Sequence, residues 1–283
     1  MEKCRQWVKK NAYWGISILL FVVIAGIFAG VRHAGEKEYR VVCLGDSIMG
    51  DVRDNTAVSG YIEVTTGMSV YNGGFGGTKA SCVDNGNRAA VDDNVFSLVE
   101  LTEAIVYQDF SVQNAGVNRY DGMVYFAEGI KGLNRVDWSE VEILIIEHGV
   151  NDYLSGAPLD NPENAYDVTT YGGALRYTLR LLQDKRPDLR IILCTPTYCW
   201  FYAEQVSCQE KNLGGGYLED YVNLELEIAK EFGVEIIDNF HESGIGGAFE
   251  NWSDYTEDGL HLNDAGRKLI AGRISAVIMQ GTE

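Results

Sequence analysis

Short apolar runs alternate with helical patterns after residue 40, and this alternation limits the fold more than any other feature of the chain. The runs are rich in β-branched residues and predict buried strands at 40–44, 69–72, 143–147, 190–195 and 235–238. Helical spacing of apolar residues is clearest at 170–184, 217–232 and 264–279. Alternating strands and helices build a parallel sheet with helices on both faces, so we predict a three-layer α/β/α domain with about five parallel strands.

Residues 40–280 have the length of one sizeable domain with its own core. Two connections between the predicted elements are long, at 78–139 and 198–216. Connections of that length are usually functional or carry structure of their own. The first contains a helical pattern near 95–106, so we expect a partly folded insertion there.

Residues 11–31 contain no charged side chain and are long enough to cross a bilayer as a helix. Four Lys or Arg residues precede them, and positive charge is typical of the cytoplasmic side. We therefore predict a basic cytoplasmic tail at 1–11, a transmembrane signal-anchor helix at 12–31, a linker at 32–39 and an extracytoplasmic domain. A cleaved signal peptide, which would give a secreted protein, is the alternative.

The chain is strongly acidic, with 41 Asp and Glu residues against 23 Lys and Arg and a formal net charge of −18. The basic residues of the N-terminal tail make the remainder more acidic still. A nucleic-acid-binding protein needs a basic surface that displaces counterions from phosphates. No part of the predicted domain supplies one, so we exclude nucleic acid as a partner.

Six cysteines give little evidence of a metal site, because no pair has the spacing of zinc ligands. Cys199 and Cys208 fall in one predicted loop on the oxidising side of the membrane. A disulfide between them and two free thiols are both compatible with the sequence.

Polar and glycine-rich segments lie at the carboxyl ends of the first three predicted strands. These are Gly-Asp-Ser at 45–47, Asn-Gly-Gly-Phe-Gly-Gly at 72–77 and Gly-Val-Asn-Asp at 149–152. The carboxyl ends of parallel strands share one edge of the sheet, where ligands bind, so one site can collect all three. Two interpretations are open: glycine turns with an Asn-Asp helix cap, or backbone N–H groups and an Asn amide that stabilise an oxyanion.

Asp258 and His261 lie just before the last predicted helix. A neutral histidine takes a proton from a serine only if an acceptor holds its other ring nitrogen, and an aspartate three residues earlier in a turn can be that acceptor. The other histidines are weaker candidates. His148 ends a buried strand and is predicted to be structural, while His33 and His241 lack a carboxylate in a matching arrangement.

These four segments, in this order, make the sequence similar to the SGNH (GDSL-like) hydrolase superfamily over about residues 40–280. The resemblance implies a flavodoxin-like sheet and a catalytic triad. In that triad Ser47 is the nucleophile, His261 is the general base and then the acid, and Asp258 orients His261.

The resemblance also implies an oxyanion hole with three donors. They are the backbone N–H groups of Ser47 and Gly77 and the side-chain amide of Asn151. Glycine fills four of the six positions at 72–77, so the neighbouring Gly76 is an alternative to Gly77.

The implied reaction is hydrolysis of a carboxylic ester through an acyl-enzyme, with no metal and no organic cofactor. The extracytoplasmic location, the acidic domain and loop aromatic residues at 200–202 and 252 favour O-acetyl groups on a small molecule or glycan. A lysophospholipase or short-chain lipase and an acyltransferase of the same fold are alternatives. A noncatalytic surface-binding module is a further alternative, against which the complete set of motif residues argues.

Overall fold

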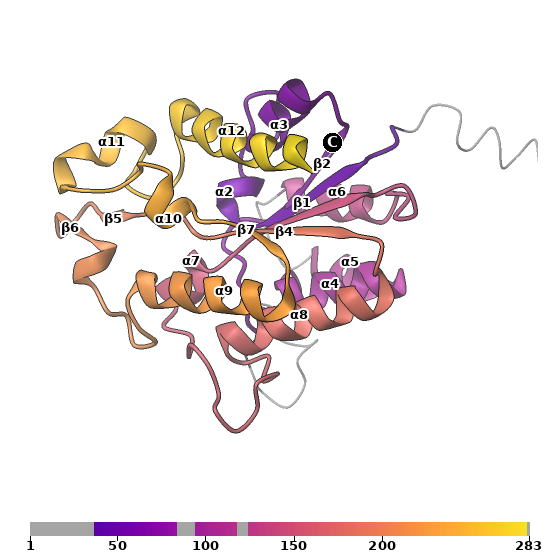
Figure 1. Cartoon of the computed structure of the whole chain (residues 1–283), viewed down its shortest axis with the longest axis horizontal. Coiled ribbons are helices and arrows are strands. Elements are labelled where there is room, and N and C mark those ends of the chain that lie inside the picture. The colour runs from indigo at the N-terminus through magenta and orange to yellow at the C-terminus, as the bar shows by residue number, and fades with distance from the viewer. Residues whose placement is uncertain (1–36, 84–93, 118–123, 282–283) are drawn as a thin grey trace, which may run out of the picture. The chain divides into compact units, whose positions relative to one another are not determined.

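The computed structural model describes residues 37–83, 94–117 and 124–281 (Figure 1). No helix within these ranges is both long and apolar enough to cross a membrane. The predicted tail and transmembrane helix at 1–31 lie outside the described residues, as does most of the linker at 32–39.

Five strands form the central sheet, in the order β2-β1-β3-β4-β7 and with every neighbouring pair parallel. Their bounds are Val41–Gly45 (β1), Val70–Gly74 (β2), Ile143–Glu147 (β3), Arg190–Cys194 (β4) and Glu235–Ile237 (β7). This is the flavodoxin-like strand order, which places ligands at the switch between β1 and β3. The predicted five-stranded parallel sheet is confirmed.

Helices cover both faces of the sheet, and Figure 1 shows α4, α8 and α9 on one side and α3 and α12 on the other. Their bounds are Val58–Thr66 (α3), Leu98–Tyr107 (α4), Tyr171–Lys185 (α8), Leu218–Phe232 (α9) and Asp264–Gln280 (α12). Side-chain caps fix where the long helices begin. Thr170 accepts a hydrogen bond from Gly173 N–H at the start of α8, and Asn263 accepts one from Gly266 N–H at the start of α12.

The shorter elements lie between these. They are α2 (Ser47–Gly50), α5 (Ser111–Gly116), α6 (Val124–Leu133), α7 (Val150–Leu154), α10 (Asn239–Glu242), α11 (Trp252–Tyr255), the strands β5 (Trp200–Phe201) and β6 (Val206–Ser207), and the 3-10 helices Cys208–Glu210 and Phe249–Asn251. The insertion predicted at 78–139 contains α4, which packs on α8. This helix of the insertion therefore belongs to a helical layer of the domain.

The connection at 198–216 contains the antiparallel hairpin β5–β6, which pairs Trp200 with Ser207. Cys199 and Cys208 continue this pairing, because Cys208 N–H donates to the Cys199 carbonyl oxygen at 3.0 Å. Both are buried and both are free thiols. Of the two states that the sequence left open, the structure contains the reduced one.

Candidate active site

Ser47 is the first residue of α2 and is separated from β1 by Asp46 alone, so it lies at the carboxyl edge of the sheet. Asp46 caps this helix by accepting a hydrogen bond from Ile48 N–H at 3.0 Å. Gly45 is required by close packing, because a Cβ atom there would lie 2.8 Å from the carbonyl oxygen of Glu147 on β3. The tight glycine contact and the aspartate cap together fix where the serine emerges.

The backbone of α2, which carries Ser47, packs directly against the backbone of the glycine-rich segment that follows β2. A Cβ atom at Gly50 would lie 2.6 Å from the Gly74 carbonyl oxygen, and one at Gly74 would lie 2.8 Å from the Gly50 nitrogen. Phe75 N–H also donates to the Gly45 carbonyl oxygen at 2.8 Å. Two sequence segments that were predicted separately therefore form one rigid surface around the serine.

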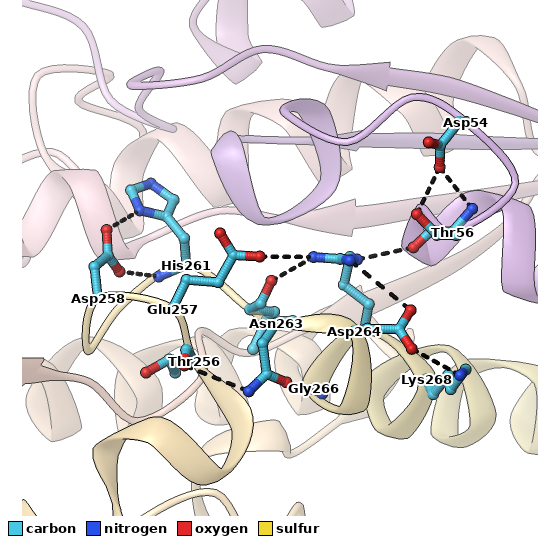
Figure 2. Close-up of polar contacts among 12 residues, drawn as sticks. Asp54, Thr56, Thr256, Glu257, Asp258, His261, Asn263, Asp264, Gly266 and Lys268 are labelled. Atoms are coloured by element: carbon cyan, nitrogen blue, oxygen red, sulfur yellow. Dashed lines mark hydrogen bonds and ion pairs between the residues drawn. The ribbon is translucent and has the colours of Figure 1, made fainter.

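His261 links Ser47 to Asp258. Its Nε2 lies 3.1 Å from Ser47 Oγ, and its Nδ1 lies 2.7 Å from Asp258 Oδ2. Asp258 Oδ1 also accepts the backbone N–H of His261 at 2.8 Å, as Figure 2 shows. A carboxylate only accepts hydrogen bonds, so Nδ1 carries the proton of the neutral ring and Nε2 presents its lone pair to the serine hydroxyl.

Asp258 is ionised in this arrangement. Partial burial opposes its ionisation, but the hydrogen bonds that it accepts from His261 and from Leu260 N–H outweigh burial and lower the pKa of Asp258. Its side chain is 54% exposed and that of His261 is 40% exposed. The Asp258–His261 pair is therefore open to solvent, whereas Ser47 is almost buried.

The loop that carries Asp258 and His261 is closed by its own backbone. Thr256 and Leu262 form an antiparallel bridge at its base, and Glu257 N–H donates to the His261 carbonyl oxygen at 2.8 Å. The Asp258–His261 geometry is thus set locally, within one short turn.

Arg267 of α12 holds this loop against the segment before α3. Its side chain is mostly buried and donates to the carbonyl oxygens of Leu262 at 2.6 Å and Thr56 at 2.8 Å. Arg267 Nη1 also lies 3.5 Å from Glu257 Oε1, and Nη2 lies 3.9 Å from Asp264 Oδ1. Figure 2 shows these two carboxylates beside the loop. A cation on the last helix therefore joins the two ends of the domain beside the site.

The aromatic residues of the β5–β6 hairpin differ in role: Trp200 supports the turn that carries Asp258 and His261, whereas Tyr202 is exposed. Trp200 is buried: its backbone N–H donates to the Gly259 carbonyl oxygen at 2.8 Å and its indole N–H to the Gly247 carbonyl oxygen at 3.2 Å. It therefore supports the Asp258–His261 turn instead of lining a pocket. Tyr202 is 61% exposed, and its ring centroid lies 5.2 Å from that of Trp252. Phe201 is partly buried, with its ring between Tyr153 and the Lys211 ammonium, so Tyr202 and Trp252 are the stronger candidates for contact with a substrate.

The contacts of the glycine-rich segment distinguish Gly77 from Gly76. Gly76 N–H donates to Tyr125 Oη at 2.8 Å and is therefore occupied. Gly77 adopts a φ of 74°, which favours glycine. No acceptor within the described part of the chain takes its N–H.

Asn151 lies near Ser47, but its amide already has two acceptors. Nδ2 donates to the Thr78 carbonyl oxygen at 3.0 Å and to Asp46 Oδ2 at 3.2 Å. The idea that this asparagine caps the following helix is wrong, because the N-cap of α7 is Gly149 and no side chain caps it. The Asn151 side chain instead joins the ends of three strands.

Asp152 is a supporting residue whose role the sequence did not reveal. Its carboxylate is fully buried and accepts the backbone N–H groups of Ala80 at 2.8 Å and Ser81 at 2.9 Å. These bonds anchor the chain just after Gly77. The Asn-Asp pair of the third segment thus holds the backbone at 78–81, directly after the glycine-rich segment.

Asp238 and His241 form a second Asp-x-x-His pair, so the expectation that His241 lacks a matching carboxylate is wrong. Asp238 Oδ2 lies 2.8 Å from His241 Nδ1, and Oδ1 accepts the His241 backbone N–H at 3.0 Å. The Nε2 atom, however, lies 3.2 Å from Glu219 Oε1. Burial lowers the pKa of His241, but the two carboxylates outweigh it and raise this pKa. No ring nitrogen is left for a serine.

His148 has no place in the site. It is buried at the end of β3, and burial lowers the pKa of its imidazole to about 3, which keeps it neutral. Within the described ranges, no group of three or more His, Cys, Asp or Glu side chains could hold a metal ion.

Residues 43–269 match the GDSL-like lipase/acylhydrolase family, and the chain belongs to it. It is accordingly a carboxylic ester hydrolase. A search of the curated proteins found no match.

Solved structures with the same fold include a possible lipase from Chitinophaga pinensis (17% identity, 85% of this chain and 97% of that one covered, TM-score 0.55). An aryl esterase of M. smegmatis (12% identity, 86% and 99% covered) has a TM-score of 0.51. A carbohydrate acetylesterase family member from Sinorhizobium meliloti (12% identity, 86% and 98% covered) also has a TM-score of 0.51. At these identities the similarity shows a shared fold and nothing more.

Proposed function

We propose that the protein is an extracytoplasmic serine esterase that removes short acyl groups, above all O-acetyl groups, from a small molecule or a glycan. The observation that carries this proposal is the continuous contact from Ser47 Oγ through His261 to Asp258, at 3.1 and 2.7 Å. An aspartate-held imidazole within hydrogen-bond distance of a serine is the arrangement that activates a hydroxyl for attack on a carbonyl.

In the proposed reaction, Ser47 Oγ attacks the ester carbonyl while His261 Nε2 takes its proton. The oxyanion is stabilised by the N–H groups of Ser47 and Gly77 and by the Asn151 amide. His261 then gives the proton to the leaving alcohol oxygen as the tetrahedral intermediate collapses to an acyl-enzyme. A water that His261 activates attacks the acyl carbon, and the second collapse releases the acid and restores the serine.

Asn151 takes part in this reaction only if its amide changes partners. Both amide hydrogens have internal acceptors, at Thr78 and Asp46. We infer that one of these bonds is shared with the oxyanion as charge develops, since catalytic hydrogen bonds often shorten only in the complex with substrate. The oxyanion, unlike a neutral carbonyl oxygen, carries the charge needed to compete with these acceptors.

The exposure of the acid-base pair supports a substrate that is larger than its acyl group. His261 and Asp258 are open to solvent, so an ester carried on a polymer can approach the serine. The paired rings of Tyr202 and Trp252 are attached near the catalytic turn, since Thr256 Oγ1 donates to the Trp252 carbonyl oxygen. Aromatic faces of this kind suit the apolar face of a sugar.

Turnover of p-nitrophenyl esters of increasing chain length tests the proposed function. We expect the protein to hydrolyse the acetyl ester, to prefer it to the octanoyl ester, and to be labelled at Ser47 by a fluorophosphonate. A preference for the long chain would favour a lipase or lysophospholipase, and transfer of acetyl to a sugar in place of water would favour an acyltransferase. Absence of both turnover and labelling would favour a noncatalytic binding module.

We also propose that residues 12–31 anchor the protein in a membrane with the hydrolase domain outside. The uncharged run behind four basic residues supports this location. We expect the full chain in the membrane fraction and its C-terminus to be cleaved by protease added to intact cells. A soluble product that begins near Gly30 would instead demonstrate a cleaved signal peptide.

A further inference from the structure

A buried glutamate that the proposed reaction does not use lies directly behind the nucleophile. Glu147 is the last residue of β3, where it pairs in register with Gly45, the residue before Asp46. Its side chain is 1% exposed, and Asp46 is fully buried. The two carboxyl groups are within hydrogen-bond reach of each other.

The existing hydrogen bonds of this pair show where a proton must lie. Both oxygens of Asp46 already accept hydrogen bonds, Oδ1 from Ile48 N–H and Oδ2 from the Asn151 amide. Neither oxygen of Glu147 has a donor among the described residues. Two carboxylates in contact repel each other, whereas a carboxylic acid is a hydrogen-bond donor. A proton on Glu147 therefore replaces the repulsion with a hydrogen bond from one Glu147 oxygen to Asp46.

We propose that Glu147 is a positioning residue that, as a neutral acid, donates one hydrogen bond to the Asp46 carboxylate. Asp46 is thereby held as the common acceptor of Ile48 N–H, at the start of the helix that carries Ser47, and of the Asn151 amide. Glu147 touches neither the serine nor a substrate and acts only through Asp46. This inference rests on the proposed esterase function, whose nucleophile and oxyanion donor it aligns.

The surroundings of Glu147 keep it neutral. Burial raises the pKa of Glu147 well above the usual range, and the neighbouring acids Asp46 and Glu225 raise it further. Burial also raises the pKa of Asp46 to about 7, opposed by the bond from Ile48 and by His261. The titratable groups that face the pair are Asp51, Asp152, Tyr171, Cys194, Glu225 and His261. Of these only His261 can become a cation. Ionising Glu147 would therefore place a second negative charge beside Asp46.

Two substitutions of Glu147 distinguish a role as hydrogen-bond donor from a role in filling space. Glu147→Gln keeps the size and an N–H donor toward Asp46, so we expect its kcat to stay within about threefold of the wild type. Glu147→Leu fills the space without a donor, and we expect kcat to fall by about 10- to 100-fold with little change in KM, because small misplacements of catalytic groups have effects of this order. The matched control is Thr178→Val on α8, a fully buried position whose hydroxyl has no hydrogen-bond partner among the described residues and for which kcat should be unchanged.

The pH dependence of stability gives a readout that packing alone would not move. A carboxyl whose pKa is raised in the folded state binds more protons there than in the unfolded chain. The folded state therefore loses stability as pH rises above the unfolded value of about 4.3. Glu147→Gln removes this proton, so its melting temperature should fall less than that of the wild type between about pH 5 and pH 8.

The outcomes are distinct. Equal kcat in Glu147→Gln and Glu147→Leu, beside an active wild type, would overturn the positioning role and leave the esterase proposal intact. A wild type that neither turns over nor labels would overturn both. If Glu147→Leu does not fold, the melting curves of Glu147→Gln decide, and a pH dependence equal to that of the wild type would overturn the proposal.

Discussion

Replacing Ser47 or His261 with alanine is expected to lower kcat on an acetyl ester by at least about 10⁴-fold. The two side chains act as a unit, because Ser47 Oγ lies 3.1 Å from His261 Nε2 and neither can form the acyl-enzyme alone. The double variant should therefore be no less active than either single variant. Folding should be unaffected, since neither residue belongs to the apolar core. Kinetics and thermal melting on the same samples provide the measurement.

His241→Ala is the matched control for His261→Ala. Both histidines follow an aspartate by three residues, and both pairs have the same side-chain and backbone contacts. They differ at Nε2, which faces Glu219 in one case and Ser47 in the other. We expect full turnover from His241→Ala. Near-normal turnover of Ser47→Ala or His261→Ala would show that the nucleophile or the base has been misassigned.

Asn151→Ala is expected to lower kcat by about a hundredfold or more, equivalent to ~3 kcal/mol, while KM changes little. The reason is that a donor to the oxyanion contributes only as charge forms in the transition state. Asn151→Asp should be at least as inactive, because it keeps the size of the side chain but puts acceptors where the donor was. Steady-state kinetics on both variants measure the effect.

A purely structural role for Asn151 predicts the opposite pattern. Its bonds to Thr78 and Asp46 join strand ends, and losing them would cost about 1 kcal/mol each in the free energy of unfolding. A destabilised variant with full kcat would therefore remove Asn151 from the oxyanion hole. Denaturant unfolding of the same preparations separates the two explanations.

The fold could be predicted from the sequence because the strands are buried on both faces. Such strands are continuous apolar runs, and Ile143–Glu147 was located without error. The chain order then placed Ser47, Gly77 and Asn151 at one sheet edge, since parallel strands end together. The order of the strands along the sequence was thus enough to predict that these residues lie together.

What the sequence could not reveal depends on contacts between distant residues. The choice between Gly76 and Gly77 rests on Tyr125, far along the chain, which occupies the Gly76 N–H. The Asp238–His241 pair could have been found from its spacing, but its exclusion from catalysis depends on Glu219. The importance of Glu147 follows only from its burial beside Asp46, because in sequence it is one more residue of an apolar strand.

Ser47 and His261 are in contact but are separated by 214 positions, so they lie near opposite ends of the domain's sequence. During synthesis the serine emerges with the first strand, while His261, its proposed base, emerges only with the segment before the final helix α12. That helix must also be complete for Arg267 to bridge Leu262 and Thr56. A nascent chain therefore carries an unactivated serine until almost the whole domain has left the ribosome, so truncated products should be unable to hydrolyse esters within the cell that makes them.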